Sequence, residues 1–308
     1  RGRLTGVIVG GPGTQRLQSV AGGAAGWVAI GGNDRLPRRP LVVSSRDGVQ
    51  WRPMAGGLFA PRGDETLRAY GVTAGPRGHV VVGEDGSAAV VWHSADLRTW
   101  RRGKGADKDL DPTDDGNRWM QAVASGPGGY VAVGGAKGPG GDHVPVAWTS
   151  PDGLTWTVRK TPVLPVGASG YLHHVAVSGQ VVVAAGEYRV GDEPPKRFAF
   201  ASSDGGQSWQ ETMPAGLADA ESVTGVSALP QGVAIHGTTG AEGAADVALW
   251  VSRDGRTWRM ERPGETALSG TGDQRLTGLV TFRGGMLAVG ASTTGQGTQP
   301  VLWRRPAF

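Results

Sequence analysis

The sequence predicts an all-β protein, a six-bladed β-propeller built from four-stranded antiparallel blades. Three observations carry this prediction: a short motif that recurs five times, short apolar segments bounded by turn residues, and a composition rich in both glycine and tryptophan. The chain has 308 residues, of which 54 are glycine and 11 are tryptophan, against 5 phenylalanines and 4 tyrosines. A disordered glycine-rich chain would not carry so much aromatic bulk, so the composition indicates a folded protein.

A Ser-x-Asp motif that ends in tryptophan recurs at nearly regular intervals. Its tryptophans are 49, 56, 53 and 49 residues apart, a period of about 52 that fits six times into the chain. Because self-similarity at such a period is the signature of repeat architectures, the period indicates the size of one structural unit. The motif residues are Ser45, Asp47 and Trp51; Ser94, Asp96 and Trp100; Ser150, Asp152 and Trp156; Ser202, Asp204 and Trp209; and Ser252, Asp254 and Trp258.

Each unit contains the same succession of four short segments. In the third unit, an alternating segment at 121–124 is followed, after a glycine turn, by a second at 130–134. The third segment ends in Trp148, eight residues before the motif tryptophan Trp156, where the fourth begins. The segments are rich in β-branched and aromatic residues, and glycine, proline and aspartate bound them, which is typical of strands. Four antiparallel strands, repeated radially, describe the blades of a propeller.

We expect one domain over residues 1–308. The six blades are expected at about 16–56, 67–104, 117–161, 170–213, 221–263 and 274–308. The sixth unit has only three segments before the sequence stops at Phe308. We therefore expect the apolar segment 4–10 to supply the fourth strand of the last blade and to close the ring.

Deletion of residues 1–10 is expected to lower the melting temperature sharply, because the last blade would lose its outer strand and expose a sheet edge. Differential scanning calorimetry of the full and the shortened chain measures the change. An unchanged melting temperature would contradict the terminal-strand arrangement.

The motif itself is expected to have a structural role. Its serine and aspartate side chains can bond the backbone amides of the turn that they begin. The glycine that follows the aspartate relaxes that turn, and the tryptophan is large enough to pack between neighbouring blades. Tight turns of this kind also explain much of the glycine excess.

The five motifs resemble Asp boxes, the Ser/Thr-x-Asp-x-Gly-x-Thr-Trp repeats of sialidases and of many secreted bacterial propellers. Residues 202–209 fit the full pattern; the other four motifs are one residue shorter, and Leu97 follows Asp96 where the pattern has glycine. The resemblance implies a propeller fold and a secreted bacterial protein, with the motifs away from the active face. Sialidases also carry an early Arg-Ile-Pro motif, which this sequence lacks. No catalytic residue is therefore transferred.

An alignment of the units on their first segments places several arginines and aromatic residues at one equivalent position. Arginine can form two parallel hydrogen bonds with a carboxylate or a phosphate, and aromatic rings stack on sugars. These residues are therefore candidates for binding an anionic or saccharide ligand at the propeller mouth, although ordinary strand-entry residues would show the same pattern. They are Arg16, Arg68, Trp119, Tyr171 and Arg275.

An acidic run offers a candidate calcium site. Asp107, Asp109 and Asp111 alternate as the ligands of calcium loops do. Pro112 stands where such a loop has glycine and Arg118 where it has glutamate, so a solvated acidic loop is the alternative. No other cofactor is expected: the chain has no cysteine, and its 6 histidines show no metal-ligand spacing.

Charge and hydropathy exclude two classes of partner. The formal net charge is +4 and the basic residues are scattered, which argues against nucleic acid. No apolar stretch approaches the 18 or so residues of a membrane span.

From the repeats, their resemblance and the candidate ligand residues, we expect a non-catalytic recognition module that binds a glycan or a protein through its loop-rich face, within a larger secreted assembly. The alternative is a sialidase-like or other glycoside hydrolase, with paired carboxylates among Asp64, Glu65, Glu221 and Asp273.

Overall fold

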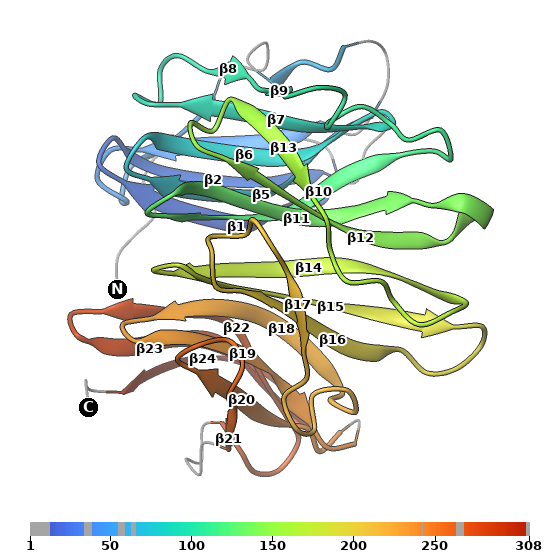
Figure 1. Cartoon of the computed structure of the whole chain (residues 1–308). Helices are drawn as coiled ribbons and strands as arrows, with labels where there is room; N and C mark the ends of the chain where they lie inside the picture. The colour runs from blue at the N-terminus through green and yellow to red at the C-terminus, as the bar shows by residue number, and fades with distance from the viewer. Residues whose placement is uncertain are drawn as a thin grey trace. The chain divides into compact units, whose positions relative to one another are not determined.

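The chain is all-β and has the fold of a six-bladed β-propeller, as the sequence predicts. The computed structural model describes residues 13–33, 39–54, 59–62, 66–241, 243–262 and 268–305. Contacts divide the chain into two compact units, 1–159 and 160–308, and each unit carries three blades (Figure 1). Within every blade, consecutive strands pair antiparallel in the order of the sequence.

The first unit holds blades 1 to 3, coloured from blue to green in Figure 1. Blade 1 consists of β1 (Gln15–Gly23), β2 (Gly26–Asn33), β3 (Pro40–Ser45) and β4 (Trp51–Pro53). Blade 2 consists of β5 (Leu67–Gly75), β6 (Gly78–Asp85), β7 (Ala88–Ser94) and β8 (Arg101–Arg102). Blade 3 consists of β10 (Arg118–Gly126), β11 (Gly129–Lys137), β12 (His143–Ser150) and β13 (Thr155–Arg159).

The second unit holds blades 4 to 6. Blade 4 consists of β14 (Ala168–Ser178), β15 (Val181–Val190), β16 (Lys196–Ser202) and β17 (Gln210–Thr212). Blade 5 consists of β18 (Ser222–Leu229), β19 (Gly232–Thr239), β20 (Asp246–Ser252) and β21 (Arg259–Glu261). Blade 6 shows β22 (Asp273–Phe282), β23 (Gly285–Thr294) and β24 (Gly297–Arg305). The segment 4–10, expected to complete this blade, lies outside the described residues.

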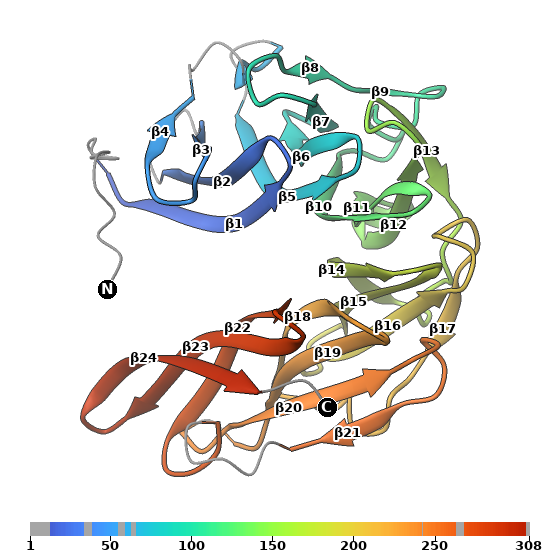
Figure 2. The same ribbon diagram turned by 90° about the vertical axis from the view of Figure 1, so that its left-hand side faces the viewer.

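Blade 3 has one strand more than the sequence predicts. The two-residue strand β9 (Lys104–Gly105) follows blade 2 along the chain but pairs parallel with β13, the outer strand of blade 3 (Figure 2). A backbone hydrogen bond extends this contact by one residue: the N–H of Ala106 donates to the carbonyl of Trp156 at 2.7 Å. The connection therefore covers the sheet edge of blade 3 and ties it to blade 2.

The core of each unit is built from large side chains on the third strands. Six such residues, one from each blade, are all 6% exposed or less: Val43, Trp92, Trp148, Phe200, Trp250 and Trp303. Three motif tryptophans, Trp100, Trp156 and Trp258, pack in clusters that combine residues of two neighbouring blades. Trp156 of blade 3 is fully buried in one cluster with Val80 and Val91 of blade 2. Burial of such aromatic area is a major source of stability.

The five Ser-x-Asp motifs form one kind of turn, called here the serine–aspartate turn, which joins the third strand of a blade to the fourth. In each turn the serine hydroxyl donates to the aspartate Oδ1 at 2.7–3.2 Å. The same Oδ1 accepts two backbone amides at 2.7–3.0 Å. Backbone hydrogen bonds from Thr257 and Arg256 hold the pKa of Asp254 at about 2. These carboxylates are therefore ionised and committed to their own turns.

Candidate functional site

The six positions that the sequence alignment equates, which include Ser222 of blade 5 beside the five candidate ligand residues, are equivalent in the structure. Each residue lies near the start of the first strand of its blade and pairs with the residue 16 positions later on the second strand. Arg16 pairs with Gly32, for example, and Arg68 with Glu84. The repeat therefore presents one side chain per blade at the same point of the sheet.

A β-bulge follows this position in every blade. The register shifts by one residue, which leaves one first-strand residue unpaired. These bulge residues are Gln18, Tyr70, Gln121, His173, Thr224 and Thr277. Bulges re-aim side chains and locally end the ladder, and they are frequent beside binding sites.

A glycine on the second strand makes room for each bulge. It stands 15 residues after the aligned residue, whose carbonyl oxygen lies 1.8–2.2 Å from where a Cβ on that glycine would be. No side chain fits at such a distance, so the fold needs glycine there. The six positions are Gly31, Gly83, Gly134, Gly186, Gly237 and Gly290.

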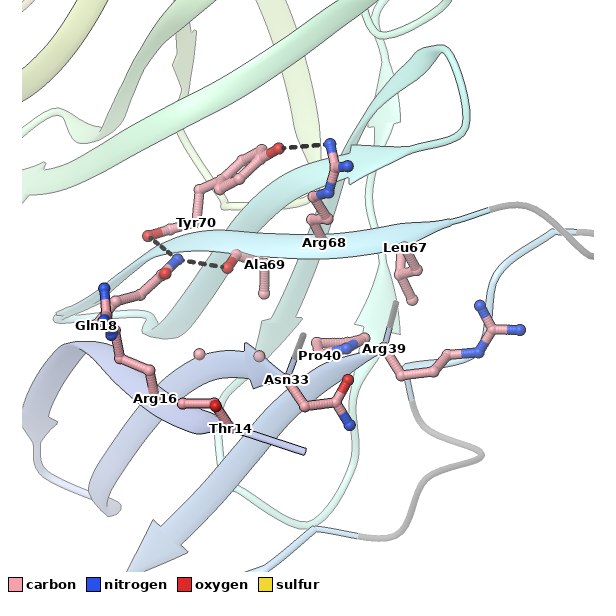
Figure 3. Close-up of a pocket in the computed structure, with 12 residues that line it drawn as sticks. Thr14, Arg16, Gln18, Asn33, Arg39, Pro40, Leu67, Arg68, Ala69 and Tyr70 are labelled. Carbon is pink, nitrogen blue, oxygen red and sulfur yellow. Dashed lines mark hydrogen bonds between the residues drawn. The ribbon is translucent and has the colours of Figure 1, made fainter. Parts of the chain in front are cut away.

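One pocket of about 440 Å³ lies between blades 1 and 2, where the first strands begin (Figure 3). Its volume is within the range of small-molecule sites. The charged side chains among its described lining residues are all arginines: Arg16, Arg39 and Arg68. The polar side chains that join them are Thr14, Gln18, Asn33 and Tyr70. The pocket is therefore basic and rich in hydrogen-bonding groups.

Arg68 is held in place on the wall of this pocket. It forms an ion pair with Glu84, a residue that is 8% exposed, and its Nη1 donates to the Tyr70 hydroxyl at 3.3 Å (Figure 3). Burial raises the pKa of Tyr70 to about 12, so the phenol is neutral. The side chain of Arg68 is still 37% exposed. Its cation can therefore meet a ligand without first moving.

The opposite wall combines one fixed and one accessible side chain. Gln18 Nε2 donates to the carbonyl of Ala69 at 2.8 Å, which ties blade 1 to blade 2. Arg16 is exposed, and within the described part of the chain its side chain forms no hydrogen bond or ion pair. Asn33 Oδ1 is buried and has no hydrogen-bond partner among the described residues. Of these groups, the exposed guanidinium of Arg16 is the one available to a ligand.

The other three candidate ligand residues lie elsewhere. Trp119, on β10 of blade 3, is 6% exposed and meets the edge of His143, with ring centroids 5.1 Å apart. Its ring is part of the interior and offers no face for a sugar. Tyr171, on β14 in the second unit, stacks on His173 at 4.2 Å. Arg275, on β22, is exposed. Of the five, the structure brings only Arg16 and Arg68 into one described pocket.

The acidic run after β9 is part of the packing of the first unit. Leu110 is 6% exposed within the core cluster of blades 2 and 3. The carbonyl of Asp109 accepts the Trp148 indole N–H at 2.8 Å, and its carboxylate accepts the Val158 amide at 3.1 Å. Among the described residues, no group of three His, Asp or Glu side chains is placed to hold a metal ion. The carboxylates of Asp107, Asp109 and Asp111 therefore form no such group.

The carboxylates considered for hydrolysis are also engaged where they are described. Glu221 accepts the Thr238 hydroxyl at 2.7 Å, and Asp273 accepts the Ala245 amide at 3.0 Å. Asp64 and Glu65 lie outside the described residues.

Sequence reasoning missed Gln18, Asn33 and Tyr70 as pocket residues. A signal for two of them was present, because a glycine recurs 15 residues after each aligned position in all six units. That spacing marks the bulge, and the bulge places Gln18 and Tyr70 beside the two arginines.

Comparison with known proteins defines the fold. No protein-family profile matches the sequence, and no curated protein matches it. A protein of unknown function from Dyadobacter fermentans is similar in structure over 94% of this chain and 95% of its own, with a TM-score of 0.57 and 14% identity.

No helix in the described part of the chain has the length and apolar character needed to cross a bilayer.

Two further solved structures share this architecture. The Trypanosoma rangeli sialidase matches with a TM-score of 0.56 and 15% identity over 95% of this chain, which spans about half, 54%, of the sialidase chain. Aleuria aurantia lectin, a fungal six-bladed β-propeller that recognises fucose, matches with a TM-score of 0.51 and 10% identity, over 94% of this chain and 92% of the lectin. At these identities the likeness shows the fold alone: this chain has the architecture of a six-bladed β-propeller.

Proposed function

We propose that the protein is a non-catalytic recognition module that binds an acidic glycan in the pocket between blades 1 and 2. The observation that carries the proposal is that three arginines, Arg16, Arg39 and Arg68, line one pocket of about 440 Å³, with their guanidinium groups at different points around it (Figure 3). A guanidinium group binds a carboxylate through two parallel hydrogen bonds. The neighbouring amides and the phenol of Tyr70 suit the hydroxyl groups of a sugar.

The fixed geometry of the pocket supports binding. Glu84 and Tyr70 hold Arg68, and Ala69 holds Gln18, before any ligand arrives. Preorganised groups lose little conformational entropy on association, so more of the interaction energy appears as affinity. The lectin that shares the fold recognises fucose, and the sialidase was solved with difluorosialic acid. A saccharide ligand for this propeller is consistent with both.

Arg16→Ala is expected to weaken glycan binding at least about 10-fold, because a hydrogen bond to a charged group contributes about 1.5–3 kcal/mol. An array of sialylated, uronate-bearing and neutral glycans identifies the ligand, and titration calorimetry measures the affinity. Arg16 is the residue of choice because its side chain is exposed, whereas loss of Arg68 would leave Glu84 buried without its ion pair.

Arg77→Ala is the matched control, since Arg77 is an exposed arginine in the β5–β6 turn of the same unit and does not line the pocket. Its affinity should equal that of the unchanged protein. Equal losses in both variants would contradict the assigned pocket. Turnover of fluorogenic glycosides would overturn the non-catalytic assignment and favour a glycoside hydrolase.

The setting of the module is part of the same proposal. We propose that it acts outside a bacterial cell, as the resemblance of its motifs to Asp boxes implies, and that it forms part of a larger secreted assembly.

A further inference from the structure

A second opening lies at the other end of β3. Pro40, the first residue of that strand, lines the pocket described above, whereas Ser44 and Ser45, at its end, line a groove of about 420 Å³. This groove runs between the serine–aspartate turns of blades 1 and 2, and we call it the turn groove. It belongs entirely to the first unit.

The turn groove carries three uncommitted cations. Arg46, Arg52 and Arg98 line it and are exposed. Within the described part of the chain, none of their guanidinium groups forms a hydrogen bond or an ion pair. Asp47 and Asp96 also line the groove, but each uses Oδ1 to accept two amides of its own turn at 2.8 Å. Both carboxylates stay ionised, so the groove holds three positive and two negative side chains, and the guanidinium groups remain available for a ligand.

A strained residue forms part of the groove. Leu97 has φ 59, a left-handed conformation, where the corresponding residues of other turns are glycines, such as Gly48 with φ 73 and Gly255 with φ 72. Its side chain packs against the core cluster of blades 1 and 2, which includes Val28 and Trp92. A bulky residue in this conformation is costly and points to a specific role. Here Leu97 supplies an apolar contact between the two blades beside the three arginines.

The same place in the second unit provides an internal comparison. Between the turns of blades 4 and 5, the corresponding opening measures only about 20 Å³. Ser203 stands there in place of Arg46, and Gln210 in place of Arg52. The open and basic turn groove is therefore a property of blades 1 and 2 and does not follow from the repeat itself.

We propose that the turn groove is a second binding site, which takes the tetrahedral oxyanion of a phosphate or sulfate ester. Such a group offers at least three oxygens, and three guanidinium groups around one groove can each donate to it. The site is distinct from the pocket at the start of the first strands, with which it shares no lining residue.

The test exchanges the two arginines for the residues of the closed counterpart. Glucose 6-phosphate and glucose 6-sulfate are titrated separately into the full chain and into the double variant Arg46→Ser, Arg52→Gln, with calorimetry and amide NMR shifts as readouts. We expect one or both esters to bind the unchanged protein and the double variant to bind at least 10-fold more weakly. Comparison of the two esters identifies the preferred source of the oxyanion.

Two controls make the result specific. Arg256→Ala changes the arginine of the closed opening, which corresponds to Arg98, and Arg77→Ala changes an exposed arginine that lines neither the first pocket nor the turn groove. Both should bind the ester as the unchanged protein does. Absence of binding by the unchanged protein, full affinity in the double variant, or an equal loss in Arg256→Ala would overturn the proposal. If the double variant fails to fold, Arg52→Gln alone is measured against the same criteria.

Discussion

Gly134→Ala is expected to destabilise the protein by about 3 kcal/mol, the upper part of the range for forcing extra atoms into a packed site. A Cβ at this position would lie 2.2 Å from the carbonyl oxygen of Trp119 and 2.8 Å from the amide nitrogen of Gln121. Both are backbone atoms of the bulge, so neither can move away as a side chain would. Urea denaturation followed by tryptophan fluorescence measures the loss.

Gly128→Ala is the matched control from the same β10–β11 hairpin. A Cβ on Gly128 would meet no heavy atom within 4 Å, and its φ does not fall in the left-handed range. Alanine there should be neutral or should stabilise the fold by up to about 1 kcal/mol, because it restricts the unfolded chain. Similar losses in the two variants would show that the bulge is not the cause.

Acidification from pH 7.5 to pH 5 is expected to lower the free energy of unfolding markedly, through three histidines of the second unit. Burial lowers the pKa of His236 to about 3, and that of His173 and of His174 to about 4. Below pH 6.5 the unfolded chain binds protons that the folded chain excludes, so stability falls with pH until the folded pKa is reached. For His236, which is 2% exposed, the loss at pH 5 is about 2 kcal/mol.

His236→Gln separates this effect from general acid sensitivity. The ring nitrogens of His236 lie 3.1 Å from the Thr224 hydroxyl and 3.2 Å from that of Ser227, both of which a glutamine can still bond. The variant should lose less stability between pH 7.5 and pH 5, by about 2 kcal/mol. Ser227→Ala, which keeps the histidine, should lower stability at every pH and retain the steep pH dependence. An equally steep decline in His236→Gln would contradict the assignment to this residue.

The blades could be predicted because their signals are local. A serine–aspartate turn needs only residues within four positions of one another, and each third strand carries one large buried side chain, such as Trp148, two positions before its end. The backbone bonds and burial found at these positions match the expected roles. The order of strands then follows from short connections, which leave antiparallel neighbours as the simplest pairing.

The candidate site was less predictable because it depends on pairing between distant segments. A two-residue strand such as β9 has no periodicity to detect, and it pairs with a strand about 50 residues later. The bulge changes which side chains face the pocket, so Tyr70 enters it, whereas Trp119 at the position of Arg68 in blade 3 is buried. Sequence spacing equates such residues, but it does not reveal their surroundings.

In each blade, the bulge and its facing glycine belong to the fold, whereas the aligned side chain just before the bulge varies from blade to blade. The facing glycine recurs in all six repeats, while the residue whose carbonyl it faces is arginine in three blades and tryptophan, tyrosine or serine in the others. At Arg16 and Arg275 that side chain is exposed, so we expect its exchange to leave the bulge and the facing glycine in place. A combinatorial library at these exposed positions, with every facing glycine kept, should therefore yield folded variants with altered ligand preference.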